Sequence, residues 1–249
     1  MAREPNSVTT AIPAVVATRT RVVYQEWKHV RHPSIAHANL AVTEQHPIGT
    51  TYDGYNNKHA NKTVLQQHCA FFDLNGDGVI TPRETFVSFR LLGWNLFLTV
   101  VSVIFIHVGF SYVTQPPNQW LPDVLFRIHL PQLHRAKHGS DSGTYDHEGR
   151  FRPQQFADFF SKYGRRLRNG DYGLTFREAM YGAWSQRCVM DVFGVTAAFF
   201  EWSATYITLW PSDGVMRMED VRQVYDGSYF YKIAGDRRAN YPAVGKGNT

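Results

Sequence analysis

The sequence predicts a mainly α-helical protein with EF-hand helix–loop–helix units, one intact and the others degenerate, and an apolar helical segment that associates with membranes. Three observations lead to this fold class. A twelve-residue loop carries a full set of calcium-binding oxygens, apolar residues recur at helical spacing on both sides of it, and a long uncharged run follows. Strand-like alternation of apolar and polar residues is scarce.

The intact unit centres on the loop from Asp73 to Glu84, named here the 73–84 loop, which matches the EF-hand pattern at each diagnostic position. Gly78 occupies the sixth position, where the chain must turn sharply. The six predicted ligands all supply oxygen to calcium, and in loop order they are Asp73, Asn75, Asp77, Val79, Thr81 and Glu84. An ordinary acidic loop between helices is the alternative, but helices are expected on both flanks.

EF-hands usually occur in pairs, and residues 144–155 (TYDHEGRFRPQQ) align best with the 73–84 loop. Thr144 at the first position and Gln155 at the twelfth replace two ligand carboxylates. Strong calcium binding is therefore not expected, and these residues are predicted to form a structural partner that pairs with the 73–84 loop.

Two fainter copies of the pattern follow, at residues 167–178 and 209–220. Leu174 and Met216 occupy their eighth positions, where an EF-hand loop enters its short strand. With these copies, the sequence predicts an architecture of four helix–loop–helix units.

The longest uncharged run contains the apolar stretch Leu91–Val113, which would reach about 34 Å as one helix. It is open to three interpretations: a membrane-spanning helix, a monotopic helix or hairpin, and a buried core helix. If the loops before and after it pair, both of its ends lie on one side of a membrane. A segment that returns, or that lies in the interface, satisfies this condition and a single span does not.

Composition limits the other classes of function. The net charge of +5 suits an anionic membrane surface, and no basic run with interleaved aromatics supports nucleic-acid binding. Two cysteines form no disulfide framework, and no signal peptide is expected. The predicted regions are a loosely ordered arm (1–61), the EF-hand unit (62–90), the apolar segment and proline-containing turn (91–131), a helical region with degenerate loops (132–235) and a tail (236–249).

Three histidines are candidate ligands for a metal or haem. His68 lies five residues before the 73–84 loop, and His134 and His138 would share a face if both lay on one helix. Imidazole nitrogens bind haem iron, zinc or copper. Each histidine taken alone is more often a satisfied polar contact, no C-x-x-C-H motif occurs, and the spacing suits zinc poorly.

The stretch QQHCAFFDLNGDGVITPRETF, the apolar segment after it and HRAKHGSDSGTYDHEGRF together resemble the caleosin family. DVFG, FFEW and YDGSYF in the last third resemble it too, so the similarity covers roughly residues 46–233. The family's proline knot is loose here, because its prolines lack the usual tight spacing; they are Pro116, Pro117, Pro122 and Pro131.

The resemblance implies a calcium-binding haem peroxygenase that transfers oxygen from a fatty-acid hydroperoxide to unsaturated fatty acids or similar acceptors. Its cofactors would be haem b and calcium. His68 and His138 match the family's haem-associated histidines, and His134 would be a third contact. His68 is expected to be the proximal ligand, and His138 the distal group that handles the peroxide proton.

The implied partners are a phospholipid monolayer or membrane and fatty acids with their hydroperoxides; homo-oligomerisation stays open. The implied location is a lipid droplet or the endoplasmic reticulum membrane, facing the cytosol. The alternative function is a non-enzymatic, calcium-sensing coat or tether of lipid droplets, which would not need the three histidines.

Overall fold

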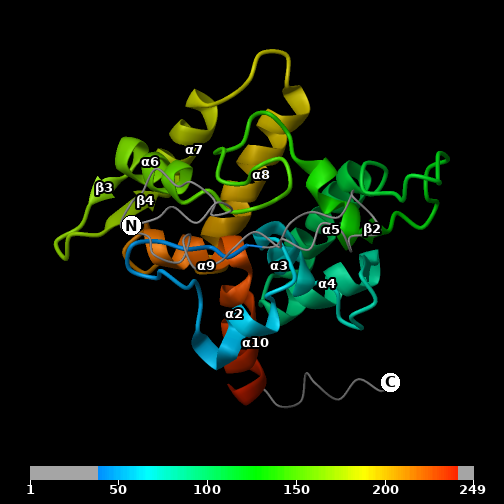
Figure 1. Ribbon diagram of the computed structural model, residues 1–249, viewed down its shortest axis with the longest axis horizontal. Coiled ribbons are helices and arrows are strands. Elements are labelled where there is room, and N and C mark those ends of the chain that lie inside the picture. The colour runs from blue at the N-terminus through cyan, green and yellow to red at the C-terminus, as the bar shows by residue number, and fades with distance from the viewer. Residues whose placement is uncertain (1–38, 241–249) are drawn as a thin grey trace, which may run out of the picture.

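The structure, a computed structural model, describes residues 39–240, with side chains as far as residue 237. Helices dominate this part of the chain, which confirms the mainly α-helical class (Figure 1). In chain order the helices are η2 (Tyr52–Gly54), α2 (Tyr55–Lys58), α3 (Val64–Ala70), α4 (Pro82–Leu91), α5 (Leu96–Phe110), η3 (Leu130–Ala136), α6 (Pro153–Tyr163), α7 (Phe176–Ser185), α8 (Val192–Leu209), α9 (Met218–Asp226) and α10 (Ser228–Asn240).

The strands are short and form two small antiparallel sheets. One sheet pairs β1 with β2, and the other has the order β3–β4–β5. The strand bounds are β1 (Val79–Ile80), β2 (Ile128–His129), β3 (Arg165–Arg166), β4 (Tyr172–Thr175) and β5 (Val215–Arg217). Because these strands lie inside loops between helices, they fix how neighbouring helix–loop–helix units sit against each other.

The partner of the 73–84 loop differs from the predicted one. Val79 pairs with His129 and Ile80 with Ile128, so β2 is the partner strand. Residues 144–155 instead close on themselves through a bridge between Tyr145 and Phe151. The predicted pairing of residues 144–155 with the 73–84 loop is therefore wrong. The chain after α5 still returns to the 73–84 loop, through β2.

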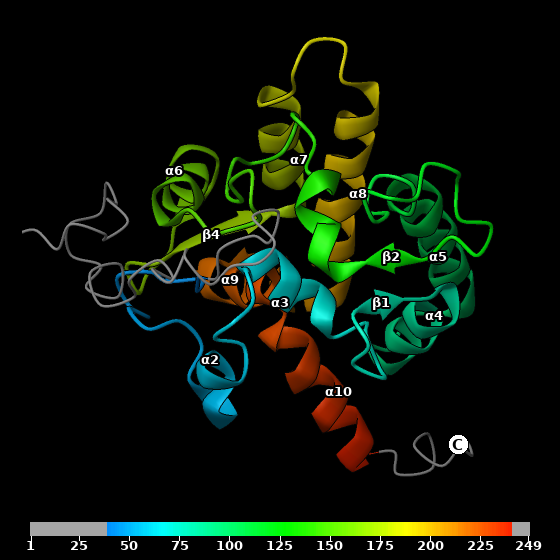
Figure 2. The same cartoon turned by 45° about the vertical axis from the view of Figure 1, so that its right-hand side comes forward.

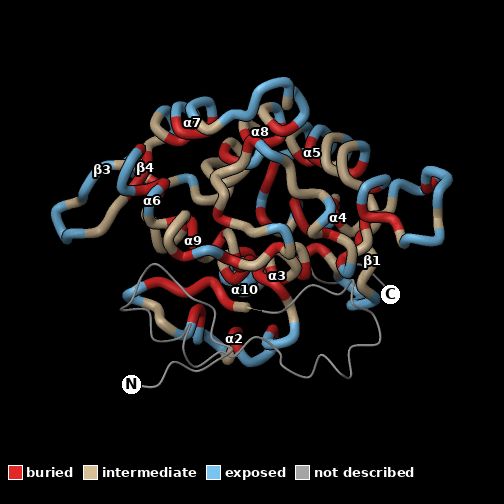
Figure 3. Tube along the Cα trace, turned by 45° about the horizontal axis from the view of Figure 1, so that its top comes forward, coloured by how far each residue is buried: buried red, intermediate tan, exposed pale blue. Residues whose placement is uncertain are grey.

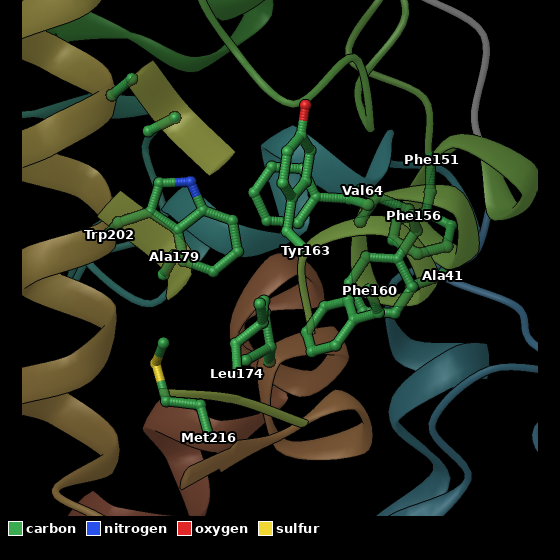
Figure 4. Close-up of a cluster of buried hydrophobic side chains, with 14 residues drawn as sticks. Ala41, Val64, Phe151, Phe156, Phe160, Tyr163, Leu174, Ala179, Trp202 and Met216 are labelled. Carbon is green, nitrogen blue, oxygen red and sulfur yellow. The ribbon is translucent and has the colours of Figure 1, made fainter. Parts of the chain in front are cut away.

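The two faint copies of the pattern pair with each other. Leu174 in β4 lies opposite Met216 in β5, and both side chains are fully buried. The strands thus join α6 and α7 to α8 and α9 in the manner of paired helix–loop–helix units. Figure 4 shows Leu174 and Met216 below Trp202 of α8 and beside the aromatic residues of α6.

Two hydrophobic clusters make up the core. The first, drawn in Figure 4, joins α6, α7 and α8 to the β4–β5 pair. The second joins α3, α4, the β1–β2 pair, η3 and α10. Helix α9 contributes Val221 to the first cluster and Val224 to the second, so it lies between them.

The apolar segment is divided rather than continuous. Helix α4 runs into it as far as Leu91, and Gly93 then takes a backbone φ of +86°, which favours glycine. The Asn95 side chain accepts a hydrogen bond from the Leu98 amide and starts α5 as a new helix. Within residues 39–240, no helix has both the length and the apolar character required to cross a bilayer.

The arm predicted at residues 1–61 lies outside the described part as far as residue 38, as does the tail beyond residue 240. For residues 39–61 the expectation of loose order is wrong. Ala41 joins the first core cluster, and its carbonyl accepts a bond from the buried Arg222 guanidinium. Arg222 also donates to Thr50 at 2.9 Å and to Asp226 at 3.1 Å. Figure 3 shows the buried stretch of this segment leading to α2.

Candidate functional site

A cavity of about 260 Å³ lies between the two core clusters. It is bounded by α3, α4, α5, α8, α9, the start of α10 and the loop after η3, which surround the centre of the molecule in Figure 2. Most of its wall is apolar. A few polar side chains reach the wall, among them His68, His138, Glu201, Ser142 and Tyr145. An apolar cavity with a few convergent polar groups is the usual form of a small-molecule site.

His68 is positioned by helix α3. The Thr63 side chain and Gln66 form a reciprocal cap at the start of this helix, which places His68 in its last turn. Its Nδ1 donates a 2.7 Å hydrogen bond to the Val224 carbonyl of α9, and its ring packs edge-on against Phe230. Nε2 is then the unprotonated nitrogen. Burial lowers the pKa of His68, although the Val224 carbonyl opposes the shift, so the ring is held neutral.

His138 lies on the loop after η3 and lines the same cavity. Its Nε2 is 3.5 Å from a carboxylate oxygen of Glu201, in α8. Burial alone would lower the pKa of His138, but the hydrogen bond and charge of Glu201, helped by Asp141 and Asp191, outweigh burial and raise it. The His138 Nδ1 is buried and has no hydrogen-bond partner among the described residues.

The His138 loop is fixed by the start of α8. Asp191 caps this helix by accepting from the Gly194 amide, and it also accepts from the amide and hydroxyl of Ser140 at 2.8 and 2.7 Å. The Cys188 amide donates to the same hydroxyl at 3.0 Å. Neither Asp191 nor Glu201 was predicted to serve the site. A capping aspartate directly before an apolar run was the available signal for Asp191, whereas nothing local indicates a role for Glu201.

His134 does not line the cavity. It lies in η3, where burial and the neighbouring Arg135 lower its pKa, and its Nδ1 is buried without a hydrogen-bond partner among the described residues. Helix η3 ends at Ala136, and Lys137 has extended backbone, so His134 and His138 do not share a helical face. The structure therefore brings His68 and His138 to one cavity and leaves His134 outside it.

The 73–84 loop is shaped by hydrogen bonds from its backbone to its own acidic side chains. The Asp73 carboxylate accepts from the amides of Gly76 and Gly78, each at 2.9 Å, and Gly78 has a φ of +82°. Glu84 accepts from the Leu74 amide with one oxygen, and from the Thr81 amide and hydroxyl with the other. Glu84 thus links the two ends of the loop.

The donor set of this loop is that of a hard divalent cation, because its polar side chains present oxygen atoms from carboxylates, an amide and a hydroxyl. In residues 39–237, no three or more histidine, cysteine, aspartate and glutamate side chains are grouped as a metal site. An EF-hand draws part of its ligands from carbonyl, amide and hydroxyl oxygens, which here are those of Val79, Asn75 and Thr81. The residues present fit calcium by chemistry and by order along the loop.

The sequence was compared with known protein families and with related proteins. The model of the caleosin-related proteins matches residues 60–234. A protein of Lilium longiflorum named "Peroxygenase" is 36% identical over 240 residues, which is 96% of this chain and 97% of the relative. "Probable peroxygenase 4" of Arabidopsis thaliana is 36% identical over 70% of this chain and 86% of its own length.

A third relative, also from Arabidopsis thaliana, is named "Probable inactive peroxygenase-like protein" and is 29% identical over 61% of this chain and 71% of its own length. No solved structure matches the chain. The family match extends over most of the chain and includes the 73–84 loop, His68 and His138. The chain therefore belongs to the caleosin family.

Proposed function

We propose that this chain is a haem-dependent peroxygenase that transfers one oxygen atom from a fatty-acid hydroperoxide to an unsaturated fatty acid or a similar acceptor. One observation carries the proposal: His68 and His138 line a single apolar cavity, and their surroundings shift their pKa values in opposite directions. Such divergence is typical of residues with different roles, here a neutral ligand nitrogen and a group that moves a proton. The relatives named as peroxygenases support this class of reaction. Because another relative is named inactive, membership of the family alone does not establish that a chain is active.

His68 would hold the iron of haem b. Its Nδ1 proton is held by the Val224 carbonyl, which leaves the Nε2 lone pair available and fixes the plane of the ring. Its lowered pKa keeps that lone pair unprotonated. When bound, haem would supply the iron chemistry of oxygen transfer, and the apolar wall would exclude water from it.

His138 fits the role of the group that moves the peroxide proton. With a proton on Nε2 facing Glu201, its buried Nδ1 can accept the proton of the terminal hydroperoxide oxygen. The same nitrogen can return that proton to the oxygen that stays on the acyl carbon. The hydroperoxide then leaves as an alcohol, and its other oxygen passes to the acceptor, so that atoms and protons balance.

Paired substitutions test these two roles. His68→Val should abolish haem retention and fatty-acid epoxidation while sparing calcium binding, because it removes the ligand nitrogen. His138→Val should lower turnover more than haem content. His134→Val is the matched control, since His134 lies outside the cavity, and it should change neither. Haem is read from the Soret absorption, and activity from oxygen transfer to oleate.

The outcomes separate the alternatives. Loss of haem in His138→Val with full haem in His68→Val would exchange the two roles. If the purified protein shows no Soret band after incubation with haem, or if neither variant changes haem or activity, the catalytic proposal fails. The calcium-sensing coat or tether would then be the better reading, because it requires no histidine in the cavity.

The proposal includes calcium at the 73–84 loop. Its ligands would be the six predicted residues, with Glu84 binding through both oxygens at the last position. Glu84 already spans the loop through its contacts with Leu74 and Thr81. Calcium would thus join the end of α3, and with it His68, to the start of α4.

The proposal also includes a lipid surface, either the monolayer of a lipid droplet or the cytosolic side of the endoplasmic reticulum membrane. The outer face of α5 supports it, since Val101, Ile104 and Val108 are 42%, 59% and 62% exposed. Exposed apolar area on this scale is typical of an interaction site rather than of a free surface. Its other face contributes Phe105, Ile106 and Phe110 to the cavity wall, so deleting the whole segment would destroy the site.

Surface substitutions on α5 give a cleaner test of lipid binding than a deletion. The double variant Ile104→Asn, Val108→Asn should float less with phosphatidylcholine vesicles, because it removes apolar side chains that would enter the interface. Val87→Asn, an exposed apolar position on α4, is the control and should float like the parent. Equal flotation of all three proteins would place the lipid contact elsewhere.

A further inference from the structure

The wall of the cavity between α5 and α8 differs from its other walls. Helix α5 packs along α4, and α8 packs along α7, yet α5 and α8 border the same cavity and lie side by side in Figures 2 and 3. Aromatic rings bridge the two helices. Phe105 stacks on Phe200 with ring centroids 4.3 Å apart, and Phe110 meets Phe193 edge-on at 5.8 Å.

The other walls are held by polar bonds. His68 ties α3 to α9 through the Val224 carbonyl, and His107 ties α5 to α4 through a 2.8 Å bond with Thr85. Asp191 ties the His138 loop to α8. No hydrogen bond or ion pair of the described residues joins α5 to α8, so this wall is closed by apolar contacts, with the two ring pairs bridging the helices. Separating two stacked rings costs less than leaving buried polar groups without partners.

The Phe105–Phe200 pair has the cavity on one side and exposed surface on the other. On α5, Ile106 next to Phe105 lines the cavity, whereas Val101 and Val108, one turn before and one turn after Phe105, are exposed. Ile104, on the other side of Phe105, is exposed too. The surface outside the pair is therefore the apolar face of α5 that is proposed to contact lipid.

On α8, Phe200 has the same position between cavity and surface. Ala204, one turn after it, lines the cavity, and Thr196, one turn before it, is exposed. Phe193, two turns before Phe200, is 45% exposed, and its ring faces the position that a side chain on Gly109 of α5 would occupy. The line along which α5 and α8 meet is named here the seam. Apolar side chains from both helices border it, and the stacked Phe105–Phe200 pair closes it.

We propose that the acyl chain of the substrate enters the cavity through this seam, from the lipid side, and that Phe105 and Phe200 form its gate. The inference rests on the proposed function, because it takes the cavity as the acyl site. Separation of the two rings joins the cavity to the apolar face of α5, so a fatty acid can pass from lipid to cavity without crossing water. Phe105 and Phe200 then control the rate at which substrates exchange.

The gate is tested by the exchange kinetics of cis-parinaric acid, a fluorescent C18 fatty acid, delivered from phosphatidylcholine vesicles to the full chain. Phe105→Ala and Phe200→Ala should each raise the association and dissociation rates by about three- to tenfold, because a stacked pair contributes a barrier of that size. The two rates should rise together, since a gate lowers the barrier in both directions, whereas lost contacts with the bound acyl chain would raise the dissociation rate alone. Tyr52→Ala is the control, because Tyr52 is 78% exposed and lies in η2, outside both helices of the seam.

Phe105→Leu and Phe200→Leu keep most of the apolar volume and serve if an alanine variant unfolds; they lose the stacking and should also exchange faster. Thermal melting verifies that each variant is folded. Variants that bind the probe but exchange at the parent rate would overturn the gate and leave the proposed function intact. If the parent protein does not bind cis-parinaric acid at all, the cavity is not an acyl site, and the gate falls with the proposed function.

Discussion

The 73–84 loop and the paired loops at residues 167–178 and 209–220 are versions of one sequence pattern put to different uses. The first keeps its oxygen-bearing residues and pairs with β2, a strand outside any similar loop. The other two have incomplete ligand sets, since a leucine replaces the first carboxylate in both, yet they pair with each other in register through Leu174 and Met216. The paired arrangement is therefore best preserved where the ligand set is not.

This difference separates two roles of the same element. In the paired loops, Thr175 and Glu178 form the same cap as Thr81 and Glu84 do, so the start of the following helix is unchanged. The carboxylate of Glu178, at the last loop position, instead contacts the Arg165 guanidinium at 2.5 Å. A protein cation thus neutralises the carboxylate that a calcium ion would bind, and apolar strand residues hold the fold.

The paired loops at residues 167–178 and 209–220 are named here the second region, and the 73–84 loop the first. The largest effect is expected from disrupting the apolar contact that pairs the loops of the second region. Leu174→Ala should lower the free energy of unfolding by about 2–5 kcal/mol, because Leu174 is fully buried and the change leaves a cavity. Calcium affinity should stay the same. Urea unfolding measures the stability, and Val189→Ala, at a 91% exposed position, is the control. A calcium affinity that falls with stability would mean that the two regions are coupled.

Glu84→Gln tests the calcium ligands of the 73–84 loop. It should weaken calcium binding by tenfold or more, about 1.4 kcal/mol, because a charged bidentate ligand becomes neutral. Glu178→Gln, the same change at the equivalent position of the second region, should leave the affinity unaltered. Calorimetry on the two variants and the parent checks this. Equal affinity in all three would show that calcium binds elsewhere or not at all.

The two regions also differ in how neighbouring helices are tied, since His107 bonds α5 to Thr85 of α4, whereas stacked Phe159 and Trp202 join α6 to α8. Burial lowers the pKa of His107 in the folded state, with the Phe126 carbonyl opposing the shift. The stability due to a neutral His107 is therefore full above the unfolded pKa, near 6.5, and is lost as the pH falls towards the lower folded pKa.

His107→Gln keeps an amide that can donate and accept, but it does not titrate. Below about pH 6.5, the slope of unfolding free energy against pH should become shallower by up to about 1.4 kcal/mol per pH unit, which corresponds to one proton. Urea unfolding at a series of pH values measures it. His147→Gln, at an exposed position, should leave the slope as it is. An unchanged slope in His107→Gln would assign the acid sensitivity to other groups.

The smallest effect is expected from Arg165→Gln. Its ion pair with Glu178 is solvent-exposed, where screening by water and salt leaves little net stabilisation. Unfolding free energy should change far less than in Leu174→Ala, and calcium should still not bind at Glu178. Calcium binding gained by Arg165→Gln, detected as a second site by calorimetry, would show that the arginine is what keeps the second region free of the ion.

The parts of the fold that the sequence could predict are those decided by residues near one another along the chain. The 73–84 loop, its flanking helices and the copies at residues 167–178 and 209–220 follow from local ligand, turn and capping residues. The partner of β1 does not, because Ile128–His129 is a two-residue strand with no periodicity, and only the packing of distant helices brings it to Val79. The same limit hid the break in the apolar segment, which Gly93 and Asn95 introduce between two apolar helices.

The candidate site shows the same division. His68 and His138 were found through resemblance, and the structure brings both to one cavity. His134 and His138 do not share a helical face, because η3 ends between them. Glu201 and Asp191 escaped prediction, since each acts on a loop more than 50 residues away in the chain.

The bonds of Arg222 have a consequence for anyone who shortens this protein. The family match begins at residue 60, so a fragment cut to residues 60–234 would seem a natural choice for expression. Such a fragment lacks the Ala41 carbonyl and the Thr50 hydroxyl, and it would leave the guanidinium of a 1% exposed arginine short of two acceptors. It would also uncover the apolar patch on which Leu40, Ala41 and Val42 lie, and so favour precipitation. Fragments should begin before residue 39.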